Sequence, residues 1–511
     1  MSEIVEKCIV VRHAAAGASK NSLAVGMSAV ILAAAWLLVP SHVPSAQAVI
    51  QALEIIAPRA GLTTTNRYYK AYPGLEYRVP IAVIGGHYPN TYALTSGPSG
   101  MSVDSSTGIL TWSNPTTSGS PHSVTVQVTD ALGATATVTW TITVTTSGFI
   151  FVQAGAADGG NGLLASPFNS IDDWYVNKAN AAYSGQFIYY RSGTYNTAAA
   201  PIEDGWRLAM PSHKPTVWLA YPGDSPVINV AGSHISPYPS ISNWFMGGLV
   251  VRNMTTDFGV RIDSGGDDMV FYGCTFDDMP VGAGGVGTNA SGVMISNGGA
   301  KSNYVAFIGN TFSDFIGGSA YGILGYYADK VLVQGNTFSN MTDSSTKAIG
   351  PKMNNEYWFI RDNRINLGGL GDGIWIDTYP TTGNIEASYN LSVSNGNAFW
   401  LGQETGGYGN VESYRNTYVG SVVVDNLTAN TTSFDRDVIV NASGAVNHID
   451  RSGSGGTLNT VNILSGTTST GILDANGNLQ GSYLSYLGTR GYQRTSGDTT
   501  APSPPSGLSV N

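Results

Sequence analysis

The sequence predicts an all-β protein: a right-handed parallel β-helix, which is a solenoid of short strands, preceded by an Ig-like β-sandwich. Three observations predict this. Gly makes up 64 of 511 residues and only 11% of residues are charged, a composition that suits short strands joined by tight turns. Several segments alternate between apolar and polar residues, as strands do. Asn also recurs every 26 or 27 residues, which fits one coil of a solenoid.

Residues 1–48 are expected to be an export signal. A weakly basic start with Lys7 and Lys20 precedes an apolar run over 23–39, and 46–48 read Ala-Gln-Ala, a small-x-small cleavage pattern. The apolar run is shorter than the roughly 20 residues that span a bilayer, so cleavage is favoured over an uncleaved anchor. We therefore expect a secreted protein (extracellular, on the cell surface or periplasmic) with no stable membrane insertion after cleavage.

Residues 60–147 are expected to form a separate β-sandwich. Turn residues separate four strand-like segments, at 77–81, 108–112, 123–128 and 135–144. The last two alternate cleanly, which is typical of a sandwich. The stretch from Gly97 to Trp112 resembles the Ig-like and cadherin-like modules of secreted bacterial proteins. That resemblance implies a spacer or adhesive arm, with direct sugar binding as the less favoured alternative.

The predicted β-helix covers residues 149–490. A strand at 149–152 is followed by a helical stretch near 171–182 and by strands within 187–195 and 214–224. This order resembles the N-terminal cap and first coils of pectate-lyase-like β-helix proteins. A cap is needed because the open end of a solenoid exposes apolar side chains and unpaired strand edges. Residues 491–511 are rich in Pro, Ser and Thr and form a linker-like tail.

The asparagine repeat sets the register of the coils. The recurring residues are Asn310, Asn336, Asn363, Asn390 and Asn416. Cys274 takes the equivalent place one coil earlier, so we expect a buried structural thiol there. Stacked Asn side chains can bond to one another and to turn backbone, so these residues are predicted to be structural. The residues two positions later should stack inside: Phe312, Phe338, Ile365 and Tyr418, with Ser392 as the exception.

Alignment on this repeat brings a second strand of each coil into register. The segments are 292–296, 322–326, 348–352, 373–377 and 398–402. Their second and fourth residues are mostly apolar and should point inward, so the third and fifth should point outward. The predicted outward residues of interest are Tyr326, Lys352, Trp375, Asp377 and Trp400, followed two residues further along by Asn354, Tyr379 and Glu404.

This outward face has what a polysaccharide site needs. Trp375, Trp400 and Tyr379 offer flat apolar surfaces for sugar rings, and exposed aromatic patches of this kind mark binding surfaces. The charged residues offer hydrogen bonds and proton transfer. The alternative is that a loop near 281–299 packs over the tryptophans.

Two cleavage chemistries remain open. Asp377 and Glu404 should lie roughly 8 Å apart, within the range of inverting glycosidases. The resemblance to pectate-lyase-like proteins instead implies a basic residue that removes a proton beside a uronate carboxylate. Lys352 resembles such a base, with Arg361 or Arg364 assisting. Asp377, one coil away, should however raise the pKa of Lys352, which disfavours it as a base.

The expected partner follows from the net charge, and the expected cofactor from the resemblance. The net charge of −10 excludes nucleic acid as the expected partner, because phosphate binding needs a basic face. No cofactor is assigned with certainty. Calcium is the ion that the resemblance implies, with acidic candidates Asp267, Asp268, Asp277, Asp278 and Asp372, although paired Asp in turns more often cap or face solvent. The rival to an enzyme is a non-catalytic adhesin, spike or filament subunit, and an oligomer stays open.

Overall fold

The structure is a computed structural model. It describes residues 50–59, 66–171, 173, 186–197, 208–209, 217–236, 242–255, 258–262, 265–280, 289–295, 299–316, 318–377, 381–402, 407–426, 431–441, 446–450, 457–461 and 463–466. The predicted export signal, the linker-like tail and nearly all of the predicted helix at 171–182 lie outside these residues. No helix within the described ranges is long and apolar enough to cross a membrane.

The N-terminal module is a sandwich whose strands pair antiparallel, except that β2 pairs parallel with β9. Its elements are β1 (Glu54–Ala57), the 3-10 helix η1 (Arg67–Tyr69), β2 (Lys70–Ala71), β3 (Tyr77–Pro80), β4 (Ala82–Ile84), β5 (Thr91–Ser96), β6 (Met101–Val103), β7 (Ile109–Trp112), β8 (His122–Thr129) and β9 (Thr135–Val144). One sheet has the order β2-β9-β8-β5, a second has β3-β7-β6, and β1 pairs with β4. The four predicted strands are confirmed. The alternating segment β9 buries Val138, Trp140 and Ile142 between exposed threonines.

The rest of the described chain is the predicted parallel β-helix. One sheet, of 13 strands, takes one strand from each coil. Its strands are β10 (Phe149–Val152), β11 (Phe187–Tyr190), β14 (Val217–Ala220), β17 (Phe245–Gly247), β20 (Met269–Tyr272), β23 (Ser302–Ile308), β26 (Ala328–Gln334), β29 (Glu356–Arg361), β32 (Thr381–Ser388), β35 (Val411–Tyr414), β37 (Thr431–Asp435) and β40 (Thr457–Val461), with β34 (Gly407–Tyr408) beside β32.

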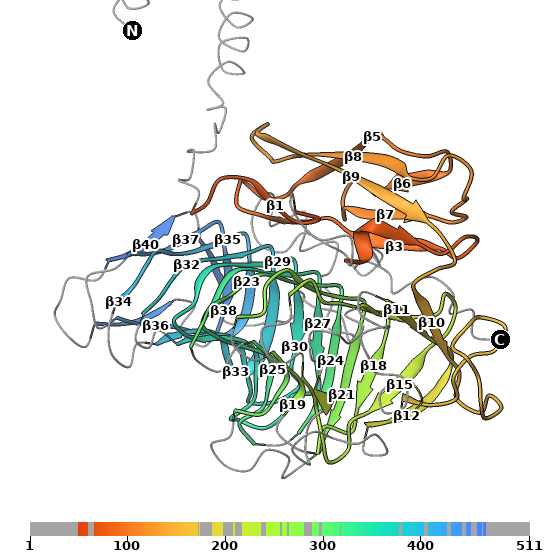
Figure 1. Ribbon diagram of the computed structural model, residues 1–511. Helices are drawn as coiled ribbons and strands as arrows, with labels where there is room; N and C mark the ends of the chain where they lie inside the picture. The colour runs from red at the N-terminus through yellow and green to blue at the C-terminus, as the bar shows by residue number, and fades with distance from the viewer. Residues whose placement is uncertain are drawn as a thin grey trace, which may run out of the picture. The chain divides into compact units, whose positions relative to one another are not determined.

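The other sheet has 19 strands and holds two alternating series. The series that follows the asparagines is β12 (Gly193–Asn196), β15 (Pro226–Asn229), β18 (Val250–Arg252), β21 (Thr275–Met279), β24 (Thr311–Phe315), β27 (Thr337–Ser339), β30 (Arg364–Asn366), β33 (Leu391–Gly402), β36 (Thr417–Asn426), β38 (Val438–Val440) and β41 (Leu464–Gly466). The other series is β13 (Leu208–Ala209), β16 (Ile235–Ser236), β19 (Phe258–Ile262), β22 (Ser291–Ile295), β25 (Tyr321–Tyr326), β28 (Lys347–Met353), β31 (Asp372–Asp377) and β39 (Asn447–Asp450), while β33 and β36 run through both. Figure 1 shows the coils following one another in chain order, from yellow through green to blue.

The asparagine ladder is confirmed as a structural device. Asn310 Nδ2 donates to Asn336 Oδ1 at 2.9 Å, and the same bond repeats along the ladder to Asn363, Asn390 and Asn416. Each Nδ2 also donates to a backbone carbonyl of the preceding coil. Cys274 begins the ladder as a buried free thiol, and burial raises its pKa to about 12, so it is unreactive.

The predicted interior stacks are also present. Phe276, Phe312 and Phe338 lie on neighbouring coils with ring centroids 4.9 and 4.8 Å apart. That spacing equals the distance between paired strands, so each ring covers the ring of the next coil. Ile365, Ser392 and Tyr418 continue the row and are fully buried.

Candidate functional site

The residues predicted to point outward lie on four neighbouring strands that pair in register, β25, β28, β31 and β33. Ile323 of β25 pairs with Ile349 of β28, which pairs with Ile374 of β31 and then Phe399 of β33. All of these are fully buried, so the inward half of the prediction is confirmed. The neighbouring residues therefore face away from the core.

A stacked tryptophan pair is the centre of this surface. Trp375 and Trp400 are register partners, their ring centroids are 4.9 Å apart and their planes differ by 7°. Both are half-buried. Tyr321, from β25, meets Trp375 edge-on at 6.0 Å. We call the surface formed by Tyr321, Tyr326, Lys347, Lys352, Trp375 and Trp400 the tryptophan face.

Lys352 is aimed at this face by a β-bulge. Pro351 pairs with Gly325 and Met353 pairs with Tyr326, which leaves Lys352 as an extra residue on β28. Bulges re-aim a side chain and interrupt pairing. The Lys352 Nζ donates to Asn289 Oδ1 at 3.1 Å and lies 6.0 Å from the Tyr326 ring and 5.8 Å from the Trp375 ring. A cation thus stands beside the aromatic surface.

A second lysine lies on the other side of Trp375. The Lys347 Nζ is 5.3 Å from the Trp375 ring centroid and 5.4 Å from that of Tyr321. It donates to the Ser345 carbonyl at 2.8 Å and lies 3.8 Å from Asp372 Oδ2. Burial lowers the pKa of Lys347, and the charge of Lys352 lowers it further, against the opposing effect of Asp372. Lys347 is therefore easier to deprotonate than an ordinary lysine.

Asp372 and Tyr326 are two further residues near the tryptophan pair whose pKa is shifted. Burial raises the pKa of Asp372, while Lys347 and the Asn397 amide, which donates to Asp372 Oδ1 at 2.8 Å, oppose that rise. Burial also raises the pKa of Tyr326 to about 12, with the charge of Asp377 acting in the same direction. The Tyr326 hydroxyl consequently remains protonated at neutral pH and can donate a hydrogen bond.

Asp377 corrects the expectation of an outward, exposed carboxylate. Its register partner is Gly402, as alternation predicts, yet its side chain is fully buried. A side chain added at Gly402 would collide with the Trp400 ring, so that indole lies over Gly402. Trp375 precedes Asp377 by two residues, as Trp400 precedes Gly402, and its ring is parallel to that of Trp400, so we infer that the Trp375 indole covers Asp377. Bulky neighbours on the same face thus bury this carboxylate, which period-2 alternation does not reveal.

The other expected site residues are distributed differently. Arg361 is fully buried on β29, in the other sheet, where its Nε and Nη2 bond to Glu386 at 2.7 and 2.8 Å and Nη2 donates to the Gly85 carbonyl at 3.0 Å. Its expected place in substrate binding is corrected to a link between the solenoid and the Ig-like module. Asn354 is half-buried at the corner after β28, with a φ of 53°. Tyr379 and Glu404 lie outside the described residues, so the predicted separation of Asp377 from Glu404 stays a prediction.

Sequence reasoning missed Lys347 and Tyr321 and considered Asp372 only as a metal candidate. These three residues lie at equivalent positions on successive coils, each directly before one of the five-residue segments of the outward face. Ser291, Tyr321, Lys347 and Asp372 are successive register partners there. Extending each aligned segment by one residue would have revealed this polar and aromatic row.

The described residues contain no group of three or more His, Cys, Asp or Glu arranged to hold a metal ion. Three of the acidic candidates for calcium have other contacts. Asp268 is bonded to Arg59, Asp277 to Arg252, and Asp267 accepts from Asn303. Calcium therefore stays a prediction that rests on the resemblance.

A match to a protein family supports the Ig-like module. Residues 60–145 match the family model described as "Putative Ig domain". No curated protein matches the chain in sequence. Among solved structures, a rhamnogalacturonan lyase aligns over 68% of this chain and 100% of its own, at 12% identity and a TM-score of 0.38.

Two further solved structures, from Bacteroides fragilis NCTC 9343, are described as a "putative alpha-galactosidase" and a "putative alpha-galactosidase/melibiase". Each aligns over 24% of this chain and 28% of its own, at 16% and 17% identity, with a TM-score of 0.14.

Proposed function

We propose that this protein binds a polysaccharide on the tryptophan face and cleaves it. The observation that carries the proposal is the stack of Trp375 on Trp400, half-buried and flanked by two lysines. Parallel indoles on adjacent coils form a flat apolar platform on which sugar rings can lie, and the lysine ammonium groups stand at its border.

The two lysines favour an acidic sugar and elimination chemistry. The chain is acidic overall, so a polyanion needs a local positive field, and Lys347 and Lys352 supply one on this face. In β-elimination a base removes the proton beside a uronate carboxylate and the glycosidic oxygen leaves. We assign the base to Lys347, because its pKa is lowered, and the contact with the carboxylate to Lys352. The protonated Tyr326 hydroxyl is the candidate donor to the leaving oxygen.

Hydrolysis is the second candidate, because Asp377 is a carboxylate buried beside the tryptophan pair. In that mechanism Asp377 and Glu404 act as the acid and base pair. The two chemistries give different products: elimination creates an unsaturated uronate with ultraviolet absorbance, whereas hydrolysis releases reducing ends without that absorbance. Assays on neutral and uronate polysaccharides, with and without calcium, separate the two.

The variants Lys347→Ala and Lys352→Ala test the assignment of roles. If the reaction is β-elimination, Lys347→Ala should lower kcat by 100-fold or more, whereas Lys352→Ala should mainly raise KM. The kcat of the unmodified protein should rise with pH and level off below the usual lysine pKa of about 10.4. Equal loss in both variants, or full activity in Lys347→Ala, contradicts the assignment. If no polysaccharide in a broad panel is bound or cleaved, the non-catalytic surface protein becomes the better account.

Secretion belongs to the same proposal, because a polysaccharide of this kind is met outside the cytoplasm. Sequencing the N-terminus of the exported protein tests it. A mature chain that begins close to residue 49 is expected, and a cytosolic protein that retains residues 1–48 would contradict it.

A further inference from the structure

The two ends of the tryptophan face differ in exposure. The outward row that contains Trp375 and Trp400 starts on earlier coils with Met294 of β22 and Leu324 of β25, which are register partners. Met294 is 3% exposed and Leu324 has no exposed surface, although strand alternation points both away from the interior of the coils. Toward the later coils the row opens, since Trp375, Trp400 and Val423 are half-buried.

A hydrogen bond across three coils lies at the closed end. Asn289 lies two residues before β22, and Lys352 lies on β28. The strand between them is β25, which pairs with β22 on one side and with β28 on the other. The 3.1 Å bond from Lys352 Nζ to Asn289 Oδ1 therefore passes over the outer side of β25. We call this bond the Asn289–Lys352 bridge.

An apolar cluster lies on the same side of the face. Four buried residues form it, with the Tyr326 and Trp375 rings packed against them: Phe258, Met294, Tyr321 and Leu324. The bridge and this cluster together occupy the outward side of β22 and β25, so no flat surface remains there for a sugar ring. At the other end Ser421, on β36, is exposed, and a sugar chain can continue in that direction.

The sugar position nearest the closed end lies at Trp375. The Lys347 Nζ is 5.3 Å and the Lys352 Nζ 5.8 Å from the Trp375 ring centroid, so the lysine assigned as base and the lysine of the bridge flank the same ring. Neighbouring coils are only ~4.8 Å apart. A sugar unit on Trp375 therefore abuts the bridge, and the chain cannot extend beyond it.

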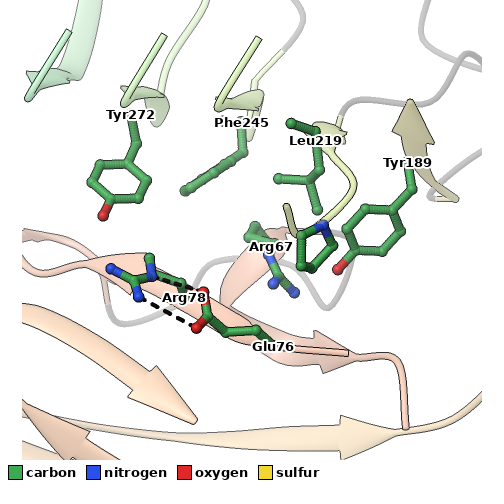
Figure 2. Close-up of a pocket in the computed structure, with 10 residues that line it drawn as sticks. Arg67, Glu76, Arg78, Tyr189, Leu219, Phe245 and Tyr272 are labelled. Atoms are coloured by element: carbon green, nitrogen blue, oxygen red, sulfur yellow. Dashed lines mark hydrogen bonds and ion pairs between the residues drawn. The ribbon is translucent and has the colours of Figure 1, made fainter. Parts of the chain in front are cut away.

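A hollow between the Ig-like module and the first coils is too small to be an alternative sugar site. Figure 2 shows it between Arg67 and Arg78 of the module and outward side chains of the coils. Gly247 lines it and interrupts the outward row of Leu219 and Tyr272. Its cavity of about 30 Å³ has room for about one water molecule. A sugar ring does not fit in this hollow.

We propose that the tryptophan face recognises the end of a polysaccharide chain. The terminal part lies on Trp375 against the Asn289–Lys352 bridge, and the rest of the chain leaves over Trp400 toward β36. This inference rests on the proposed function and names its substrate as chain ends.

Cleavage at such a site releases short products of about one or two sugar units, because one coil separates β28 from β31. Each cut is the elimination assigned above. Lys347 takes the proton beside the uronate carboxylate, the electron pair forms the carbon–carbon double bond, and the carbon–oxygen bond to the leaving sugar breaks. The leaving oxygen takes the proton of the Tyr326 hydroxyl.

Affinity electrophoresis in gels that contain polygalacturonate, alginate or glucuronan tests end recognition without requiring cleavage. Each polysaccharide is used at equal mass concentration in two preparations whose mean chain lengths differ tenfold. A protein that binds ends meets about ten times more sites in the short preparation, so its apparent Kd by mass should fall about tenfold. A face that is open at both ends would give the same Kd by mass in both.

Variants of Asn289 make the test specific to the bridge. Asn289→Gly removes the acceptor of Lys352 without strain, because Asn289 has a φ of 51°, which suits glycine. This variant should lose the dependence on chain length, and its cleavage products should become longer. Asn289→Asp keeps an acceptor for Lys352 and is the matched control, which should bind ends as the unmodified protein does. The readout is the ratio of the two Kd values, which a general loss of affinity does not change.

The outcomes separate this inference from the proposed function. Equal Kd by mass for long and short chains in the unmodified protein would overturn end recognition and leave polysaccharide binding intact. Long products early in the time course of cleavage would overturn it in the same way. An unchanged length dependence in folded Asn289→Gly would show that the bridge does not close the face. If no polysaccharide retards the protein, the proposed function fails and this inference fails with it.

Discussion

At the scale of single residues, the end of the asparagine ladder differs from its interior. Asp437 takes the next ladder position, and its Oδ1 accepts from the Asn416 backbone N at 2.7 Å and from Asn416 Nδ2 at 3.0 Å. Ser413 Oγ donates to Asp437 Oδ2 at 3.0 Å. Burial raises the pKa of Asp437 to about 7, against these hydrogen bonds. The ladder thus ends on an ionisable group.

This end makes stability depend on pH. The unfolded chain has an Asp pKa of about 3.9, below the folded value of about 7. Asp437 in its protonated form therefore contributes fully to the free energy of unfolding below pH ~4, and this contribution is lost as the pH rises to about 7. Asp437→Asn adds a Nδ2 donor in reach of the Ser413 carbonyl, which corresponds to the carbonyls bonded by the other ladder residues. The variant should gain on the order of 1–3 kcal/mol at pH 8 and less at pH 5.

Thermal unfolding of both proteins at the two pH values checks this prediction. The unmodified protein should unfold at a lower temperature at pH 8 than the variant, with the difference shrinking at pH 5. A variant that is less stable than the unmodified protein at pH 8 would show that the carboxylate is the better ladder end.

Truncation of an asparagine side chain inside the ladder should lower the free energy of unfolding strongly. Asn363 accepts from the backbone N and Nδ2 of Asn336 and donates to Asn390 Oδ1 and to the Val333 carbonyl. Asn363→Ala leaves these buried groups unsatisfied, at a cost of about 3 kcal/mol or more in the free energy of unfolding. Asn114→Ala, at an exposed residue, is the control and should cost less than about 0.5 kcal/mol. Urea denaturation measures both, and equal losses would contradict a structural ladder.

At the scale of elements, glycines in outward rows determine where the surface can be hollow or filled. Gly350 interrupts the row of Leu324 and its partners on the tryptophan face. Its space is filled by Tyr321, whose Cε1 would lie 2.5 Å from a Cβ at this position. The same ring meets Trp375 edge-on. Gly350 therefore allows Tyr321 to support the tryptophan pair.

Gly350→Ala should displace the Tyr321 ring and disturb the platform. We expect polysaccharide binding to weaken about three- to tenfold, which corresponds to the roughly 0.5–1.5 kcal/mol of an aromatic contact. Gly318→Ala is the matched control, because the nearest atom to its added Cβ is 3.7 Å away. Retention of full binding in Gly350→Ala, with Tyr321 displaced in its structure, would show that Tyr321 does not support the site.

Most of the strand pairing in the solenoid was predictable from the sequence, because a 26- or 27-residue spacing fixes which strands pair. Alternation then identified the inward residues and the outward Trp375 and Trp400. It failed for Asp377, because burial on an outward face depends on the orientation of neighbouring rings. It gave the correct face for Lys352 but not its register, because the bulge on β28 adds one residue that no pattern marks. The expectation for Arg361 came from the resemblance, and the sequence shows no sign of its bond to the Ig-like module 276 residues away.

At the scale of the whole described molecule, the core of the Ig-like module continues onto the outer face of the 13-stranded sheet, while the interior of the coils is a separate core. Buried residues of both, including Tyr68 and Phe245, pack together, with the two rings meeting edge-on at 6.1 Å. Ion pairs join Arg59 to Asp268 and Lys330 to Glu54. The module is therefore packed against the coils and does not act as a separate arm on a flexible linker.

Arg361 is a buried residue that bonds across this junction, to Glu386 of the solenoid and the Gly85 carbonyl of the Ig-like module. Arg361→Met removes the partner of Glu386 and the donor to Gly85, and it leaves a buried carboxylate unpaired. The free energy of unfolding should fall by about 3–5 kcal/mol. The double variant Arg361→Met/Glu386→Gln should recover part of that loss, since the charge is gone. A single variant as stable as the unmodified protein in urea denaturation would contradict this role.

The central claim is that the stacked tryptophans bind polysaccharide. The most direct test is affinity electrophoresis of the Trp375→Ala/Trp400→Ala variant, in gels that contain neutral or uronate polysaccharides. The account predicts that at least one polysaccharide, of the uronate class, retards the unmodified protein. The variant should lose at least about tenfold in affinity, since each lost ring contact is worth about 1 kcal/mol or more. The control variant Asn114→Ala, at an exposed residue of the Ig-like module, should bind normally. Unchanged retardation of a folded tryptophan variant would contradict the claim.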